Sequence, residues 1–149
     1  MKELHAWFDG CCEPRNPGGH ASFGVLIKWG DEVIVAESGY CGVGPEMSNN
    51  VAEFSGIVRI LEYLQCRAEH CTIKGDSMLV VNLLNGKWKA RGGRYLPYYK
   101  RAKELWESVG GNDRISLSWI PRDLNSECDT LSKQILKSRG VTFKLQPET

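Results

Sequence analysis

Residues 8–19 read FDGCCEPRNPGG, an apolar run that ends on Asp9 and passes into a segment rich in cysteine, proline and glycine. Apolar and polar residues alternate over residues 3–9, which predicts a β-strand with Leu4 and Phe8 on one face and Asp9 on the other. Asp9 would then be the last residue of a core strand, with Asn16 in the turn beyond it. Whether this carboxylate is structural or functional depends on three other acids further along the chain.

The order of the predicted elements indicates a mixed β-sheet flanked by helices. After a loop at residues 41–48 the apolar period changes from two to that of a helix, and strands and helices follow in alternation. The order βββαβααβα favours an α/β or α+β fold. The predicted strands are 3–9, 21–29, 32–40, 71–76 and 115–121, and the predicted helices are 50–66, 77–86, 96–110 and 126–138.

Length and composition are those of a single globular domain. The chain has 149 residues, and a domain of this size can bury about 68–70% of the surface that its unfolded form exposes. The opening residues, MKELHAWFDG, lack the apolar segment of a signal peptide, and no apolar stretch approaches the ~20 residues of a membrane span. We therefore expect a soluble, cytoplasmic protein with no membrane partner.

The six cysteines are expected to be reduced and buried. Without a secretory signal a disulfide framework is disfavoured, and no CxxC pair indicates zinc. Cys66 and Cys71, with His70 beside them, form only a weak metal candidate. Buried thiols that pack as small apolar side chains are the better interpretation.

One segment holds a concentration of positive charge. Of the 19 basic residues, seven lie within 87–103, where there is no acidic residue. The rest of the chain therefore contains 12 basic and 18 acidic residues. Aromatic residues lie among them, and cations with flat rings are typical of a nucleic-acid groove. A solvated helix face explains the same composition, and both interpretations stay open. The basic residues are Lys87, Lys89, Arg91, Arg94, Lys100, Arg101 and Lys103.

Four carboxylates each have a structural explanation when taken singly. Asp9 could be the polar end of a strand, and Glu53 could complete a capping box with Asn50. Asp76 could cap the helix that follows it, and Asp129 could be a first-turn acid favoured by the helix dipole. For each residue alone, the structural explanation is the stronger one.

Their positions relative to the predicted elements favour a shared site. Asp9 and Asp76 are placed at the carboxyl ends of strands, and Glu53 and Asp129 in the first turns of helices. The carboxyl ends of strands in an open α/β sheet are where ligands bind. Converging carboxylates repel one another and need cations, and oxygen ligands of this kind suit Mg²⁺ or Mn²⁺. Two such ions can activate a water molecule and stabilise the leaving oxygen of a phosphodiester.

Four motifs in register resemble type 1 ribonuclease H. They are FDGCCEPRNPGG, SNNVAEFSGI, KGDSMLVVNLLNGKW and WIPRDLNSECDTLS, and they run in order from about residue 4 to 138. The chain is most similar to compact archaeal-type members. The resemblance implies a ribonuclease H domain at 1–138, with a five-stranded mixed sheet flanked by helices. The tail at 139–149 would add an edge strand or stay loose.

The resemblance also implies an activity. The family cleaves the RNA strand of RNA/DNA hybrids with two Mg²⁺ or Mn²⁺ ions and leaves 5′-phosphate and 3′-hydroxyl ends. We expect a monomer whose partner is an RNA/DNA hybrid, with double-stranded RNA as an open second substrate. Asp9, Glu53, Asp76 and Asp129 match the catalytic acids that hold the ions. The expected substrate contacts are Cys12, Asn16, Ser48, Asn49 and Asn50, of which the asparagines would contact the minor groove.

The sequence departs from many family members at three places. The loop PRDLNSE before the last acid has no histidine, so Arg122 and Asn125 are the candidates for a role there. Met78 stands where glutamine is frequent. Residues 87–96 are too short for the basic protrusion of many bacterial members, and we expect this segment to grip the DNA strand instead. Its candidate contacts are Lys87, Trp88, Lys89 and Arg91.

Three rival interpretations remain. A hybrid-binding or partner-binding module would keep the fold and lose the chemistry, although all four acids are present. Another nuclease or a transposase-like enzyme of the same fold would also have an acid-lined site, but the chain shows no added domain. A purely structural protein would require four coincidental helix caps and strand ends as well as the basic segment.

Overall fold

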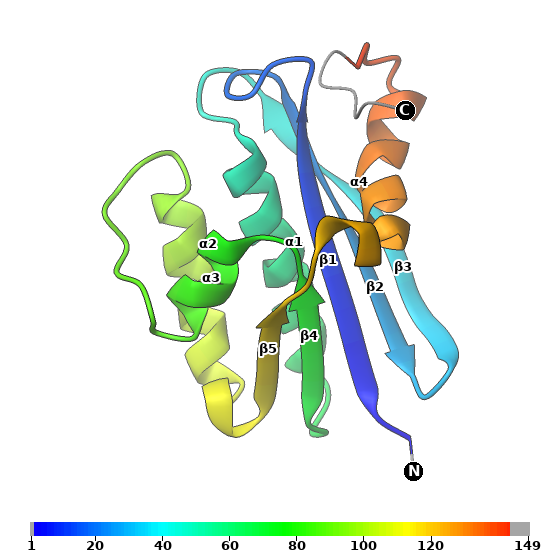
Figure 1. Cartoon of the computed structure of the whole chain (residues 1–149), viewed down its shortest axis with the longest axis vertical. Coiled ribbons are helices and arrows are strands. Elements are labelled where there is room, and N and C mark those ends of the chain that lie inside the picture. Colours follow the sequence, from blue (N-terminus) through cyan, green and yellow to red (C-terminus); the bar gives the residue numbers. More distant parts are fainter. Residues whose placement is uncertain (1, 144–149) are drawn as a thin grey trace.

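The computed structural model describes residues 2–143, which form a five-stranded sheet with helices on both faces (Figure 1). The order of elements is the predicted one, and two short 3₁₀ turns, η1 at Gly111–Asp113 and η2 at Arg122–Leu124, lie on either side of the last strand. The strands are β1 Leu4–Glu13, β2 His20–Trp29, β3 Glu32–Val43, β4 Cys71–Gly75 and β5 Ile115–Trp119. The helices are α1 Asn49–Leu64, α2 Met78–Leu84, α3 Leu96–Ser108 and α4 Ser126–Ser138.

The sheet is mixed and has the order β3-β2-β1-β4-β5. β1 pairs with β2, and β2 with β3, in antiparallel fashion, whereas β1 pairs with β4 and β4 with β5 in parallel. β1 is therefore the central strand. Its parallel ladder with β4 runs from Leu4 opposite Cys71 to Phe8 opposite Gly75 and stops there. The second half of β1 continues beyond the end of β4, paired only with β2.

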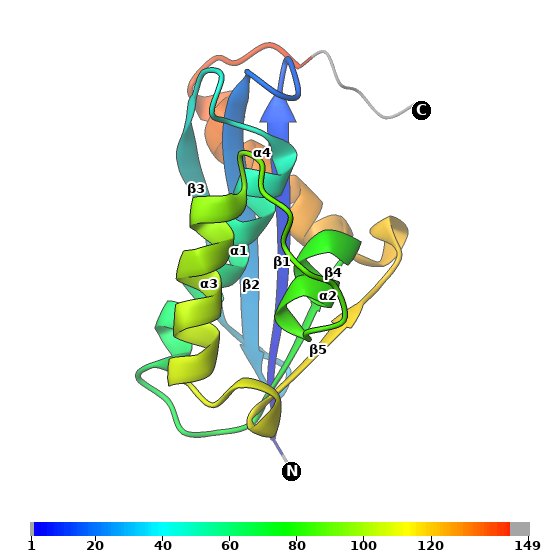
Figure 2. The ribbon, with the colours of Figure 1, turned by 90° about the vertical axis from the view of Figure 1, so that its left-hand side faces the viewer.

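Helices α1, α2 and α3 lie on one side of the sheet and α4 lies on the other (Figure 2). The side chains of Phe8, Phe54, Ile57 and Ile73 are fully buried in the main core, to which β1, α1 and β4 contribute. On the opposite face, Gly24 of β2 lets α4 approach closely. A Cβ atom at Gly24 would lie 2.5 Å from the backbone nitrogen of Ser132 and 2.6 Å from the carbonyl oxygen of Cys128.

The first strand is longer than predicted. β1 continues through the segment expected to be a turn and ends at Glu13, because residues 9–13 pair with β2 up to His20. The prediction that the strand ends on Asp9 is therefore wrong. What ends at Phe8 is the pairing of β1 with β4, so Asp9 is the first residue of β1 without a neighbour on that side. β3 likewise extends into the predicted loop, as far as Val43.

The remaining expectations have mixed outcomes. All six cysteines have free thiols, but Cys66 is exposed and Cys41 is half-buried, so only four are buried. Cys71 packs in the core, and the His70 ring is hydrogen-bonded to the Ser116 hydroxyl. Cys66, His70 and Cys71 therefore do not form a shared metal site. Residues 139–143 form no strand, and 144–149, where an edge strand was an alternative, lie outside the described residues. No helix among residues 2–143 is both long and apolar enough to cross a bilayer.

Candidate active site

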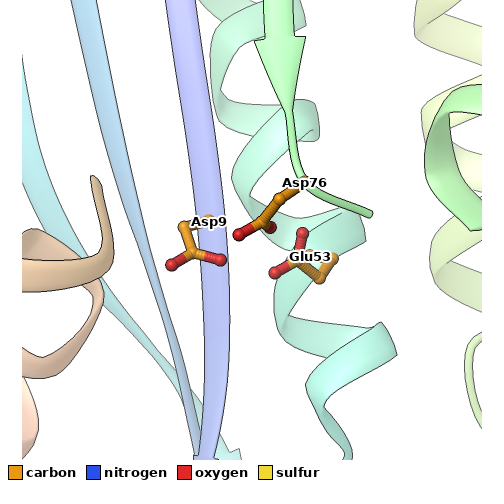
Figure 3. Close-up of side chains that lie close together, drawn as sticks. All are labelled: Asp9, Glu53 and Asp76. Carbon is orange, nitrogen blue, oxygen red and sulfur yellow. The ribbon is translucent and has the colours of Figure 1, made fainter. Parts of the chain in front are cut away.

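Three carboxylates from three elements meet where the ladder of β1 and β4 ends. Asp9 comes from β1, Glu53 from α1, and Asp76 directly follows β4 (Figure 3). Each offers an oxygen atom, and these atoms all lie within 4.8 Å of one another. Asp9 and Glu53 are only 4% and 5% exposed, whereas Asp76 is half-buried and more accessible.

The register of two parallel strands brings Asp9 and Asp76 together. Phe8 and Gly75 are the last paired residues of β1 and β4, and each acid is the next residue in its chain. Gly75 lies directly beside the Phe8 ring, because a Cβ atom at Gly75 would be only 2.4 Å from Phe8 Cε1. The two acids therefore follow the same register pair, and their separation is set by strand pairing.

Glu53 reaches the site because α1 packs directly against the backbone of Gly10. A Cβ atom at Gly10 would lie 2.5 Å from the backbone nitrogen of Glu53 and 2.7 Å from Ala52 Cβ, so only glycine fits without displacement. The amide of Gly10 donates hydrogen bonds to Asp9 Oδ1 at 2.9 Å and to Glu53 Oε1 at 2.6 Å. One backbone N–H thus holds both carboxylates.

Burial and mutual repulsion make these acids hold protons more tightly. Burial raises the pKa of Asp9 to about 7; the interaction with Glu53 opposes this shift and the charge of Asp76 adds to it. Burial also raises the pKa of Glu53, and the nearby charge of Asp9 raises it further. The pKa of Asp76 is raised by burial, against the opposing effects of its interaction with Asp9 and of the Arg122 guanidinium. Such an arrangement has an unsatisfied demand for positive charge.

The fourth acid, Asp129, stands apart from the other three. It lies in the first turn of α4 and lines the same cavity, but it is not within the 4.8 Å cluster. Its carboxylate pairs with Lys133 one turn later, at 3.3 Å from Oδ1 and 3.4 Å from Oδ2 to Nζ. The structure therefore brings three of the four predicted acids into direct proximity and places the fourth on the cavity wall.

Two of the alternative structural explanations for these acids are wrong. α1 is capped by Ser48, whose hydroxyl accepts a hydrogen bond from the amide of Val51, so Glu53 is not part of a capping box and lies beyond the first turn. α2 is capped by Ser77, which accepts from the amide of Val80, so Asp76 is not a cap. The carboxylates of Glu53 and Asp76 are thus available for another purpose.

A pair of asparagines forms one wall of the cavity. Asn16 Nδ2 donates to Asn49 Oδ1 at 2.9 Å, and the amide of Asn49 donates to Asn16 Oδ1 at 3.0 Å. This reciprocal pair fixes the loop after β1 against the start of α1, 33 positions further along. Both side chains and Asn50 line the cavity, whereas Ser48, the helix cap, is buried and does not line it.

The carboxylates lie in a cavity of about 510 Å³. Its wall includes the predicted residues Cys12 and Arg122, and also Met78. Cys12 is buried, and its thiol donates to the carbonyl oxygen of Arg15 at 3.0 Å. Arg122 and Met78 are exposed at the rim.

The remaining predicted residues lie elsewhere. Lys87, Trp88, Lys89 and Arg91 are exposed in the connection between α2 and α3, and none of them lines the cavity. That connection contains no helix, in agreement with the absence of a basic protrusion. Asn125 is buried and does not line this cavity.

The sequence analysis missed several further cavity residues. Among them are Lys133, Trp119 and the buried Glu13, which all line the wall. The spacing of four between Asp129 and Lys133, typical of a helical ion pair, was a usable signal. Trp119 continues the alternation of Ile115 and Leu117, which predicts a buried side chain, but it is 43% exposed.

The donor set fits divalent metal ions that prefer oxygen ligands. Glu53 Oε2 is buried and, within the described part of the chain, accepts no hydrogen bond. A buried carboxylate oxygen without a partner is costly unless a cation or water satisfies it. With Asp9 and Asp76 it forms the all-oxygen set that suits Mg²⁺ or Mn²⁺.

Solved structures define the class to which this fold and site belong. Ribonuclease H1 from Halobacterium salinarum has 27% identity and a TM-score of 0.76, with 91% of this chain and 98% of that chain covered. LC11-RNase H1, solved in complex with an RNA/DNA hybrid, has 24% identity and a TM-score of 0.78, with 92% and 99% covered. The protein therefore has the ribonuclease H fold.

Sequence comparison shows the family to which the chain belongs. The family model described as reverse transcriptase-like matches residues 7–135, and the chain belongs to this family of ribonuclease H-like domains. A relative named ribonuclease HI, from Halobacterium salinarum, is 34% identical over 134 residues, which are 89% of this chain. The chain spans 64% of the length of that relative.

Proposed function

We propose that this domain is a ribonuclease H that cleaves the RNA strand of RNA/DNA hybrids in the cytoplasm. The observation that carries the proposal is the convergence of Asp9, Glu53 and Asp76 within 4.8 Å, with Glu53 Oε2 buried and without a protein partner among the described residues. The relative named ribonuclease HI and the hybrid complex of a protein with the same fold support the substrate.

Asp9, Glu53 and Asp76 would hold one divalent ion, and Asp9 with Asp129 a second. The two ions, Mg²⁺ or Mn²⁺, would supply an activated water molecule and stabilisation of the leaving oxygen, which gives 5′-phosphate and 3′-hydroxyl products. The chain's own contribution is geometric: the amide of Gly10 orients both Asp9 and Glu53, and strand pairing sets the position of Asp76. Lys133 neutralises Asp129 in the absence of metal.

Substrate recognition would use the wall formed by Asn16, Asn49 and Asn50. Amide groups at this place can donate to and accept from the 2′-hydroxyls that line the minor groove of a hybrid and distinguish RNA from DNA. Because Asn16 and Asn49 already bond each other, their amides are held in place before substrate arrives. The DNA strand would lie toward Ser48 and the basic residues Lys87, Lys89 and Arg91, with Trp88 against a sugar.

The test is cleavage of an end-labelled RNA/DNA hybrid in Mg²⁺ or Mn²⁺ by the unchanged protein, by Asp9→Asn and by Asp113→Asn. Asp113 is exposed on η1 and serves as the matched control. We expect the unchanged protein and the control to cut hybrid RNA, and Asp9→Asn to lose more than ~100-fold in rate, because even outer partners of metal ligands contribute 10–100-fold.

The same RNA, single-stranded and as duplex RNA, measures specificity. Cutting of the hybrid in preference to both is the expected result, and equal cutting of duplex RNA would broaden the substrate class. Failure of the unchanged protein to cut any of them while it binds hybrid would make the domain a binding module and overturn the proposal.

A further inference from the structure

Trp119 links the end of the sheet to one of the three clustered carboxylates. It is the last residue of β5 and the register partner of Gly75, which directly precedes Asp76. Its indole Nε1 donates a hydrogen bond to the backbone carbonyl oxygen of Asp76 at 3.2 Å. The amide of the next residue, Ile120, donates to the carbonyl oxygen of Gly75 at 2.9 Å. Two consecutive residues at the end of β5 thus hold the connection that carries Asp76.

The same side chain is also exposed to the cavity. Trp119 is 43% exposed and lines the cavity together with Met78, which is 52% exposed, and Arg122. Tryptophan is enriched at interfaces, because its N–H can bond a polar partner while the apolar ring stays free to pack against another molecule. In Figure 1 the segment after β5 passes beside the end of β4 on its way to α4.

The chemistry of the exposed ring indicates what it would touch. The bases of a hybrid stay paired and stacked, so a side chain beside the scissile phosphate meets the sugars and phosphates of the RNA strand. The C–H groups of a ribose can pack against the apolar face of an indole. Asparagines and an aromatic rim both line the cavity that holds the acids, so one RNA strand could contact both.

We propose that Trp119 is a positioning residue for Asp76, through its indole N–H, and that the exposed part of the same ring packs against a ribose of the RNA strand. This inference rests on the proposed function for its substrate. It assigns to one side chain the task of coupling substrate contact to the placement of a metal ligand.

Two substitutions separate the two contributions of the indole. Trp119→Phe keeps an aromatic ring but removes the N–H donor, whereas Trp119→Ala removes both. Val33→Ala is the matched control, because Val33 is an exposed apolar residue, 49% accessible, at the start of β3 and outside the cavity. Urea unfolding of each variant without metal checks that it is folded.

The positioning role is read from metal binding without any substrate. The thermal midpoint of each protein is measured against Mn²⁺ concentration, since a ligand that binds only the folded state raises it. We expect Trp119→Phe and Trp119→Ala both to need about tenfold more Mn²⁺ for half of the rise, the lower end of the effect of outer partners of metal ligands. A Trp119→Phe curve that coincides with the Val33→Ala curve overturns the positioning role.

The ribose contact is read from hybrid affinity in the Asp9→Asn background, where cleavage is removed. Fluorescence anisotropy of a labelled hybrid should show about tenfold weaker binding for Trp119→Ala, comparable to the removal of one aromatic stacking partner, and less than about threefold for Trp119→Phe. Unchanged affinity of Trp119→Ala, while the Asp9→Asn parent binds hybrid, overturns the ribose contact alone. Failure of that parent to bind hybrid contradicts the proposed function, and the ribose contact with it.

Discussion

Asn125 donates a hydrogen bond from its side-chain Nδ2 to the backbone carbonyl oxygen of Phe8 at 2.8 Å, across 117 positions of the chain. The backbone carbonyl oxygen of Asn125 also accepts a hydrogen bond from the amide of Asp129 at 3.0 Å. Phe8 directly precedes Asp9 in β1. This single residue therefore fixes the start of α4, and with it Asp129, relative to the strand that carries Asp9.

Asn125→Ala should destabilise the protein and slow cleavage. The side chain is 2% exposed, and its removal leaves the Phe8 carbonyl without this donor, so we expect a loss of about 1–3 kcal/mol in the free energy of unfolding, measured in urea. Asn112→Ala is the control, because Asn112 makes a similar bond to Asn85 Oδ1 in an exposed position. Equal losses in the free energy of unfolding for the two variants would contradict the structural role of the buried Asn125 bond.

Gly10→Ala and Gly56→Ala should change stability in opposite directions. A Cβ atom at Gly10 meets the α1 backbone at 2.5 Å, so alanine must push β1 and α1 apart. We expect a loss of about 1–3 kcal/mol in the free energy of unfolding and of most of the cleavage activity. At Gly56, within α1, the added atom meets Phe8 and Phe23 Cβ at 3.4 Å, an ordinary contact. There we expect a gain of about 0.5–1 kcal/mol from helix propensity.

The comparison is made by urea unfolding together with cleavage of a labelled hybrid. Gly56→Ala serves as the control for Gly10→Ala, since both add one methyl group at the contact of α1 with β1. A stable, active Gly10→Ala protein would show that the close approach of α1 is not needed to bring Glu53 to the site.

Without metal, stability should fall as pH rises from about 4 to about 7. Burial raises the pKa of Asp9 to about 7 and also raises the pKa of Glu53. In this pH window the folded state therefore keeps protons that the unfolded state releases. The free energy of unfolding therefore decreases with pH. Asp9→Asn removes one of the charges, and we expect it to exceed the unchanged protein in stability at pH 8.

The measurement is urea unfolding in EDTA at pH 5, 6, 7 and 8. Asp113→Asn, which removes an exposed carboxylate, should follow the unchanged protein at each pH. Saturating Mn²⁺ should remove most of the loss at pH 8 by supplying the missing positive charge. Parallel pH curves for Asp9→Asn and the unchanged protein would contradict the close packing of the acids.

The exposed basic segment can be tested by the salt dependence of hybrid binding. Replacement of Lys87 and Lys89 by alanine should reduce the slope of log affinity against log salt by about 0.9 for each phosphate that is no longer neutralised. Lys137→Ala, which removes an exposed cation near the end of α4, is the control. A slope equal to that of the unchanged protein would favour the interpretation of a solvated surface.

Arg122→Ala should slow turnover more than it weakens binding. Burial raises the pKa of Asp76, and the Arg122 guanidinium opposes this shift, so its charge helps to keep the carboxylate ionised for metal. We expect kcat to fall about tenfold and hybrid affinity to change by less than about threefold, with Arg122→Lys close to the unchanged protein. An unchanged kcat in steady-state cleavage would exclude this role.

Several features of the fold follow from local patterns in the sequence. The alternation over residues 3–9 predicted which face of β1 is buried, and Leu4, Ala6 and Phe8 are fully buried as expected. The order of strands and helices is confirmed because side-chain period and turn residues act over a few neighbours. The motifs around the four acids indicated a ribonuclease H fold, and the solved structures confirm it.

Only the tertiary structure decided how the site is assembled. Asp9 is not the end of its strand but the residue at which β4 stops beside it, and that depends on the register of two segments more than 60 positions apart. Asp129 lies apart from the other acids because α4 is fixed by Asn125, and Trp119 faces the cavity because β5 ends beside Asp76. Local spacing contains no information on these relations, since pairing between distant strands and the docking of a helix set them.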